Sequence, residues 1–200
     1  MTNALAVQPA GGIRTVDELI AYIRADPSKG VFGSAGVGTS SHLSGLMFGQ
    51  RLGLELTHVP YRGTAANLTG LLRGDVLFCI DNLPLYTSYV QAGTVRLLAV
   101  SQATRSSLVP DVPTLQEAGL AGFDVASWFG ISAATGTPQP IIARFSAEVT
   151  SAVLLPDVAS RFRAVGAEPA PQDSAQYAAF IAAEIEKWAP LVRLSGESID

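Results

Sequence analysis

Short apolar segments alternate with amphipathic helical segments over the first hundred residues, and this alternation restricts the fold more than any other feature. Glycine- and proline-bearing turns separate the segments. Because strands that alternate with helices over short connections build parallel sheets, the pattern predicts an α/β fold with a mostly parallel sheet flanked by helices. The expected strands cover residues 5–7, 31–32, 56–59, 76–80 and 95–100. The last of these is long and continuous, which predicts a central place in the sheet.

The helices are marked by capping residues and by apolar residues at helical spacing. Thr15 followed by Glu18 forms a capping box, which places a helix start at this point. Beyond residue 100, the pattern predicts a strand over 123–133. In the last expected helix, Trp188 lies among aliphatic residues at helical spacing, which predicts that it packs in a core. Further helices are expected near residues 40–52, 65–72, 83–91, 114–118, 141–149, 157–165 and 174–193.

The composition describes a heavily buried chain and argues against several classes of partner. Hydrophobic residues make up 48% and charged residues 15%, against a usual charged share of about 25%. The net charge is −4 and the basic residues are scattered, so no nucleic acid is expected as a partner. No apolar run approaches the length of a membrane span, and the opening residues do not resemble a signal peptide. Cys79, the single cysteine, lies in an apolar segment and is expected to be inert core.

The most informative stretch is Gly33 to His42, which follows an expected strand and precedes an expected helix. Backbone N–H groups and the positive end of a helix converge at such a place, and small residues let an anion approach. The same stretch is equally typical of a tight turn with a serine cap, and the local pattern leaves both interpretations open. The candidate ligand-binding residues in it are Ser34, Ala35, Gly36, Gly38, Thr39, Ser40, Ser41 and His42.

Two other loops follow expected strands. One precedes the helix expected at 65–72, and the other closes the strand that contains Cys79. Ligands of open parallel sheets bind beyond the carboxyl ends of the strands, so the three loops together favour a cleft for a small organic anion. The candidates in these two loops are Tyr61, Gly63, Thr64, Ala65, Asp81 and Asn82.

Catalytic and cofactor motifs are missing from the sequence. It contains no Gly-Lys-Ser/Thr, no Gly-x-Gly-x-x-Gly and no Gly-x-Ser-x-Gly. His42 and His58 are the only histidines, and no cluster of ligands indicates a metal, so we expect no cofactor. His58 is interpreted as an ordinary strand residue. Asp81 is the only acid at a strand end, with nothing obvious to pair with it, which suits binding better than turnover.

A series of short motifs runs in order along nearly the whole chain. The motifs are Gly33–Leu43, His58–Gly63, Asp81–Pro84, Ala92-Gly93, Leu98–Val100, Arg105-Ser106, Pro110–Thr114, Glu117–Gly119, Ser127–Gly130 and Gly136–Pro138. In these motifs the sequence resembles the Bug family, the periplasmic receptors of tripartite tricarboxylate transporters. The resemblance implies a periplasmic protein, not an enzyme, that binds a small carboxylate (a di- or tricarboxylate, an amino acid or an aromatic acid) and delivers it to membrane components of the transporter.

The resemblance also implies a type II periplasmic-binding-protein fold of two α/β lobes. Residues 10–127 would be the complete second lobe, while 1–9 and 128–200 would be a crossover strand and the carboxyl-terminal part of the first. The loops at 34–41 and 61–65 would hold one end of the ligand, and Asp81 would select a polar or cationic group. The opening strands of the first lobe, with their ligand-gripping loop, lie outside this sequence, which therefore corresponds to an N-terminally truncated member.

This correspondence leads to an alternative expectation. Helices over 140–155 and 174–193 would expose apolar stripes that cover the first-lobe sheet in the family, and large exposed apolar patches seek partners. The alternative is therefore a truncated member that folds and self-associates, as a homo-oligomer through residues 128–200, without a transport function.

Overall fold

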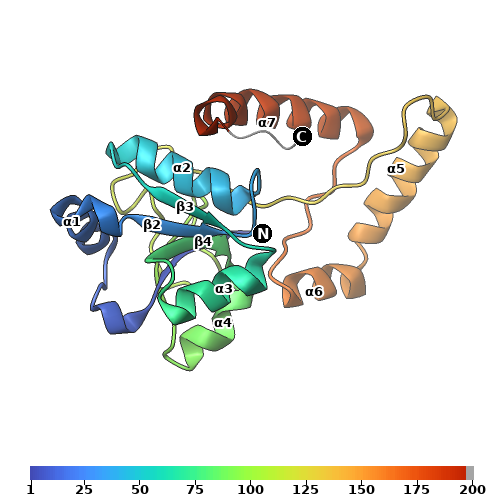
Figure 1. Ribbon diagram of the computed structural model, residues 1–200. Coiled ribbons are helices and arrows are strands. Elements are labelled where there is room, and N and C mark those ends of the chain that lie inside the picture. Colours follow the sequence, from blue (N-terminus) through green and yellow to red (C-terminus); the bar gives the residue numbers. More distant parts are fainter. Residues whose placement is uncertain (197–200) are drawn as a thin grey trace. The chain divides into compact units, whose positions relative to one another are not determined.

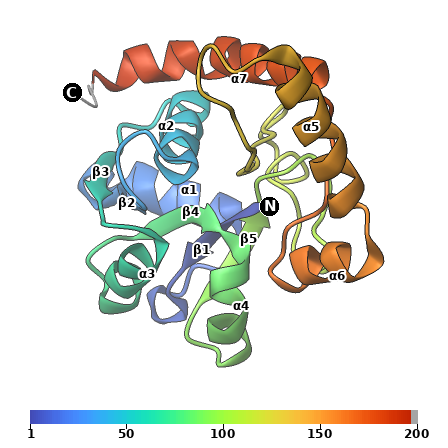
Figure 2. The same cartoon turned by 90° about the vertical axis from the view of Figure 1, so that its right-hand side faces the viewer.

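The structure, a computed structural model, describes residues 1–196 except for the side chain at position 194. The chain divides into two compact units. Unit 1 is Met1–Ser127 with the chain from Leu191 onward, and unit 2 is Trp128–Pro190. Figures 1 and 2 show the elements of both units in two views.

Unit 1 contains a five-stranded sheet with helices on its faces, as the alternating pattern predicted. The strands are β1 (Asn3–Val7), β2 (Val31–Ser34), β3 (Thr57–Pro60), β4 (Phe78–Asn82) and β5 (Arg96–Val100). Their order across the sheet is β3-β2-β4-β1-β5. β2 pairs with β3 and β4 in parallel, whereas β1 runs antiparallel to both β4 and β5. Four strands therefore point in one direction, and β1 alone points in the other.

The helices of unit 1 are α1 (Val16–Ala25), α2 (Ser40–Leu52), α3 (Thr64–Arg73) and α4 (Leu83–Gln91), with 3₁₀ turns η1 (Pro9–Gly11) and η2 (Pro27–Lys29). The connection from β2 leads to the edge strand β3, and the connection from β3 leads back in the opposite direction to β4, on the other side of β2. Since both crossovers are expected to be right-handed, α2 and α3 lie on opposite faces (Figure 1). Both helices nevertheless begin at the same edge of the sheet, where β2 and β3 end.

Local capping explains where α1 begins. The Thr15 hydroxyl accepts the backbone N–H of Glu18 at 3.1 Å, which confirms the predicted cap. The Glu18 carboxylate, however, accepts the N–H of Arg14 at 2.6 Å. Four apolar residues of the helix face the core: Val16, Leu19, Ile20 and Ile23.

Strand β1 occupies an interior position of this sheet. All five of its residues are buried, and it lies between β4 and β5. The predicted division grouped residues 1–9 with residues 128–200. In the structure a boundary between units falls after Ser127, but β1 belongs to unit 1. The assignment of these parts to the two lobes of a binding protein stays a prediction.

Three local predictions were wrong. β5 lies at the edge of the sheet, not at its centre, although it is almost entirely buried. Its outer side is covered by a following segment, because Val100 donates its N–H to Pro113 and accepts that of Leu115. The expected helix over 114–118 is not formed: Thr114 makes an isolated bridge with Val100, and residues 115–118 form turns. In the expected strand over 123–133, only Ala126 pairs, in an isolated bridge with Thr2.

Unit 2 is helical in its described residues. It contains α5 (Gln139–Val153), α6 (Pro156–Ala164) and most of α7 (Ser174–Ser195). The indole N–H groups of Trp128 and Trp188 both donate to one oxygen of Glu184, at 3.1 and 2.9 Å. Trp188 is only half-buried, so the prediction that it fills a core was wrong. The large apolar residues of this unit that are more than half exposed are Phe129, Ile131, Ile141, Phe145, Leu154, Leu155, Val165 and Ile185.

Candidate functional site: two helix N-termini at one sheet edge

The loop between β2 and α2 is closed by serine side chains. Ala35 donates its N–H to the Ser41 hydroxyl at 2.9 Å, and Gly36 donates to the Ser34 hydroxyl at 3.1 Å. Ser34 and Ser41 are both almost fully buried. The hydroxyls of these two candidate ligand-binding residues therefore fix the shape of the loop from its buried side.

Helix α2 is capped by Thr39. Its hydroxyl accepts the N–H of His42 at 3.4 Å and donates to the Gly36 carbonyl at 2.6 Å. The first N–H groups of a helix have no partner inside the helix. Within residues 1–196, no protein acceptor reaches the N–H groups of Val37, Ser40 and Ser41.

The second loop, between β3 and α3, is joined to the first by two backbone hydrogen bonds. Tyr61 donates its N–H to the Ser34 carbonyl, and Gly63 donates to the Ala35 carbonyl, both at 2.9 Å. The starts of α2 and α3 are thereby held side by side. The positive ends of two helix dipoles converge on one place, which suits an anion.

Helix α3 begins without a side-chain cap. Its cap residue is Gly63, at φ 94° and ψ 165°, a conformation open essentially to glycine. Glycine has no side chain to accept the first N–H groups of the helix, and no other acceptor in the described chain takes those of Thr64, Ala65 and Ala66. The Tyr61 side chain packs beside Gly70, more than one turn into α3, so it supports the helix away from its start.

Asp81, at the end of β4, lies behind the start of α3. Its side chain is 1% exposed and accepts the Thr64 hydroxyl at 3.2 Å, the Asn67 amide at 2.8 Å and the Asn82 backbone N–H at 2.8 Å. Desolvation by burial raises the pKa of Asp81, while the hydrogen bonds from Asn67, Asn82 and Thr64 lower it, and the net shift is upward. The carboxylate is thus occupied by the protein itself.

Comparison with known proteins identifies the family. The family described as the tripartite tricarboxylate transporter family receptor matches residues 1–196. The chain belongs to this receptor family. Protein BugT of Bordetella pertussis is 32% identical over 195 residues, which are 98% of this chain and 60% of that protein.

Solved structures of related proteins share the fold of this family member. The structure of Rhodopseudomonas palustris Rpa4515 with adipate is 34% identical, with a TM-score of 0.88 over 98% of this chain and 65% of the other. MatC of the same organism, with bound malate, is 31% identical, with a TM-score of 0.83 over 96% of this chain and 66% of the other. This chain spans about half to 60% of the length of most curated relatives it matches.

The histidines of this family member form part of the loop structure. The rings of His42 and His58 stack with centroids 4.0 Å apart. His42 accepts the N–H of Gly38 at its Nδ1, at 3.2 Å, and His58 Nε2 lies 2.7 Å from the Ser34 hydroxyl. The prediction that His58 is an ordinary strand residue missed this role. The stack joins a residue of α2 to a residue of β3, so no local sequence pattern indicates it.

Ser127 and Asn3, which the sequence analysis did not identify as site residues, connect Ser40 and Asn82. The Ser127 hydroxyl lies 2.7 Å from the Ser40 hydroxyl, 2.8 Å from the Asn82 side-chain oxygen and 3.1 Å from that of Asn3. Ser40 and Asn82, both candidates, therefore meet through two residues that are far from them in sequence. Asn67 was missed as well, although one signal existed: it is a polar residue on the face of α3 that carries Leu68 and Leu71.

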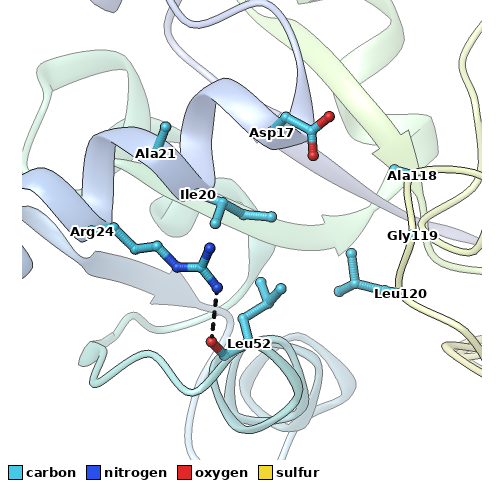
Figure 3. A pocket seen from close by; sticks show the side chains of 8 residues that line it. All are labelled: Asp17, Ile20, Ala21, Arg24, Leu52, Ala118, Gly119 and Leu120. Atoms are coloured by element: carbon cyan, nitrogen blue, oxygen red, sulfur yellow. Dashed lines mark hydrogen bonds between the residues drawn. The ribbon is translucent and has the colours of Figure 1, made fainter.

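An open groove lies elsewhere in unit 1. It has a volume of about 660 Å³ and is an open depression between α1 and the carboxyl end of α2 (Figure 3). Arg24 crosses it to donate to the Leu52 carbonyl at 3.4 Å. Since Leu52 is the last residue of α2 and the candidate loops adjoin its first, this groove is separate from the candidate site. No helix among the described residues is both long and apolar enough to cross a membrane.

Proposed function

We propose that this protein is an extracytoplasmic solute-binding receptor whose unit 1 receives the carboxylate of a small organic acid at the N-termini of α2 and α3. The observation that carries the proposal is the pair of hydrogen bonds from Tyr61 and Gly63 to the carbonyls of the first loop. They hold two helix starts together, each with backbone donors that the protein leaves unused. A helix N-terminus contributes about 1–2 kcal/mol to a partly buried anion, and here two such ends act on one ligand.

The chemical class of the ligand follows from the donors and from the relatives. Backbone N–H groups bind carboxylate oxygens without requiring a particular ligand skeleton. The related structures contain adipate and malate, both dicarboxylates. A di- or tricarboxylate is therefore the first class to test, followed by amino acids and aromatic acids.

The partners follow from the family. Receptors of this family are named for tripartite tricarboxylate transporters. We infer that the protein acts in the periplasm and delivers its ligand to the membrane components of such a transporter. No catalytic step is needed for this role.

Thermal melting in the presence of carboxylates tests the ligand proposal. Adipate, malate, citrate, glutamate and benzoate are added over a concentration series, with the uncharged diol of adipate's chain length as the control. A ligand that binds only the folded state at about 100 times its Kd adds about 2.7 kcal/mol to the free energy of unfolding. We expect at least one dicarboxylate to raise the Tm progressively, and the diol to leave it unchanged. An unchanged Tm with every acid at millimolar concentrations would contradict the proposal.

A second candidate function rests on the surface of unit 2. Side chains on α5 and α7 that would ordinarily be buried lie exposed, with Ile141 at 58%, Phe145 at 53% and Ile185 at 63%. Large apolar patches mark association surfaces. The alternative is a chain that folds and self-associates through unit 2 without delivering a ligand, and it predicts an oligomer together with no carboxylate-induced change of Tm.

A further inference from the structure

We propose that Asp81 is a positioning residue that fixes the first turn of α3 so that the backbone donors of this turn stay available to the ligand. It acts through Thr64 and Asn67 and does not itself touch the ligand. The inference deepens the carboxylate site and rests on the proposed function for its link to binding. The resemblance to the family suggested instead that Asp81 selects a group of the ligand.

The burial of Asp81 and the use of both its oxygens argue for positioning. Oδ1 accepts the Thr64 hydroxyl and the Asn82 N–H, while Oδ2 accepts the Asn67 amide. Since the residue is 1% exposed, the carboxylate presents almost no surface to an incoming molecule. A buried acceptor with three donors is satisfied by the protein alone.

The missing cap of α3 explains why such a residue is needed. Helices generally begin at Ser, Thr, Asp or Asn, whose side chain accepts the N–H groups of the first turn. A cap of this kind at position 63 would occupy the donors that a carboxylate needs. Asp81 instead reaches the helix from the neighbouring strand and holds two side chains of the first turn, Thr64 and Asn67. The start of the helix is anchored while its backbone donors remain open.

Two further residues orient Asn67 for this contact. The Cys79 thiol donates to the Asn67 side-chain oxygen at 3.1 Å, which directs the Asn67 NH₂ toward Asp81. Burial raises the pKa of Cys79, so that the thiol keeps its proton and remains a donor. Gly33 on β2 provides the space: a Cβ at this position would lie 2.2 Å from the same oxygen. The chain of contacts therefore runs from β2 through α3 to β4.

An exchange of side chains tests the arrangement. Asp81→Asn alone sets two amide NH₂ groups against each other, and Asn67→Asp alone sets two carboxylates together. The double variant Asp81→Asn with Asn67→Asp restores a donor and an acceptor, with the thiol and Thr64 still satisfied. Thr64→Val removes one donor with little change of shape, and Thr64→Ser is its matched control.

Hydrogen exchange of the α3 amides is the primary measurement because it needs no ligand. We expect each single variant and Thr64→Val to speed exchange at residues 67 and 68 by at least about fivefold, as the loss of one hydrogen bond implies. The exchanged double variant and Thr64→Ser should stay within about threefold of the unaltered protein, since their hydrogen bonds are retained. Amides of α2 should be unaffected in every variant. Unchanged exchange in the single variants, or a double variant as fast as the singles, would overturn the proposal.

Adipate and malate affinity provides the second readout. If Asp81 positions α3, the double variant recovers the affinity that each single variant loses. If Asp81 touches the ligand, exchange at α3 recovers in the double variant but affinity does not, and that outcome would also overturn the proposal. Should the unaltered protein bind neither acid, the proposed function fails for these ligands, whereas the exchange measurement still decides whether Asp81 fixes α3.

Discussion

The backbone N–H of Gly63 donates to the carbonyl oxygen of Ala35 at 2.9 Å, so that the two loops of the candidate site are joined where α3 begins. Gly63 makes this contact at φ 94° and ψ 165°. A side chain there would be strained even though nothing lies within 4 Å of its Cβ. This contact between the loops therefore depends on the backbone conformation of Gly63.

The change Gly63→Ala should accordingly weaken both stability and binding. A non-glycine residue in this region costs about 1–3 kcal/mol, which denaturant unfolding would show as a lower free energy of unfolding. We also expect weaker binding of adipate or malate, because the two helix starts lose their fixed spacing. Gly11→Ala is the matched control, since a Cβ at Gly11 has open space and the residue is not at positive φ. Equal effects of the two changes would show that the Gly63 conformation is unimportant.

Ser40 allows one backbone donor of α2 to be removed selectively. Ser40→Pro eliminates its N–H, and proline is well accepted at the first helical position. The preceding Thr39 has φ −75° and ψ 163°, which is compatible with a following proline. Ser40→Ala removes the hydroxyl but keeps the N–H. Since a hydrogen bond to a charged group contributes about 1.5–3 kcal/mol, calorimetry should show carboxylate affinity at least about tenfold lower for Ser40→Pro than for Ser40→Ala. Matching affinities would exclude this N–H as a ligand donor.

The burial of Asp81 predicts a dependence of stability on pH. Its pKa is higher in the folded protein than in the unfolded chain, so folding is coupled to proton uptake between the two values. The contribution is fully present below the unfolded pKa and is lost as the pH rises through the folded pKa. The free energy of unfolding of the unaltered protein minus that of Asp81→Asn should therefore become more positive as the pH falls toward about 4. Denaturant titrations at several pH values measure it, with Asp111→Asn as an exposed control for the loss of charge. A difference that shrinks on acidification would mean that the folded-state pKa is lowered.

The exposed face of unit 2 predicts self-association. Phe145→Glu places a charge on an exposed apolar position of α5 and should lower the average mass measured by light scattering, with less binding of a hydrophobic dye. Arg144→Gln, which changes the net charge by the same amount at a neighbouring exposed position, is the control. A monomeric mass of 20.8 kDa for the unaltered protein, with no dye binding, would eliminate the self-association candidate.

Local patterns were sufficient to predict most elements and the family. The Thr15 cap, the buried Leu19 and Ile23, and the loop before α2 all depend on residues within a few positions of one another. Hydrophobic periodicity and backbone capping act over this range, and so they leave a readable signal. The family resemblance accumulates many such short matches in order, and the match to residues 1–196 confirms it.

The tertiary structure decided how these elements combine. Antiparallel pairing of β1 with β4 and β5 joins residues separated by more than 70 positions. The stack of His42 on His58 and the contacts of Asp81 with Thr64 and Asn67 likewise form only once α2, α3 and β4 are assembled. The sequence by itself determined which loops precede α2 and α3 and so have backbone donors at a helix start. Only the fold decided that Ser34, Ser41 and Asp81 are buried behind those donors, because burial depends on partners that no local pattern specifies.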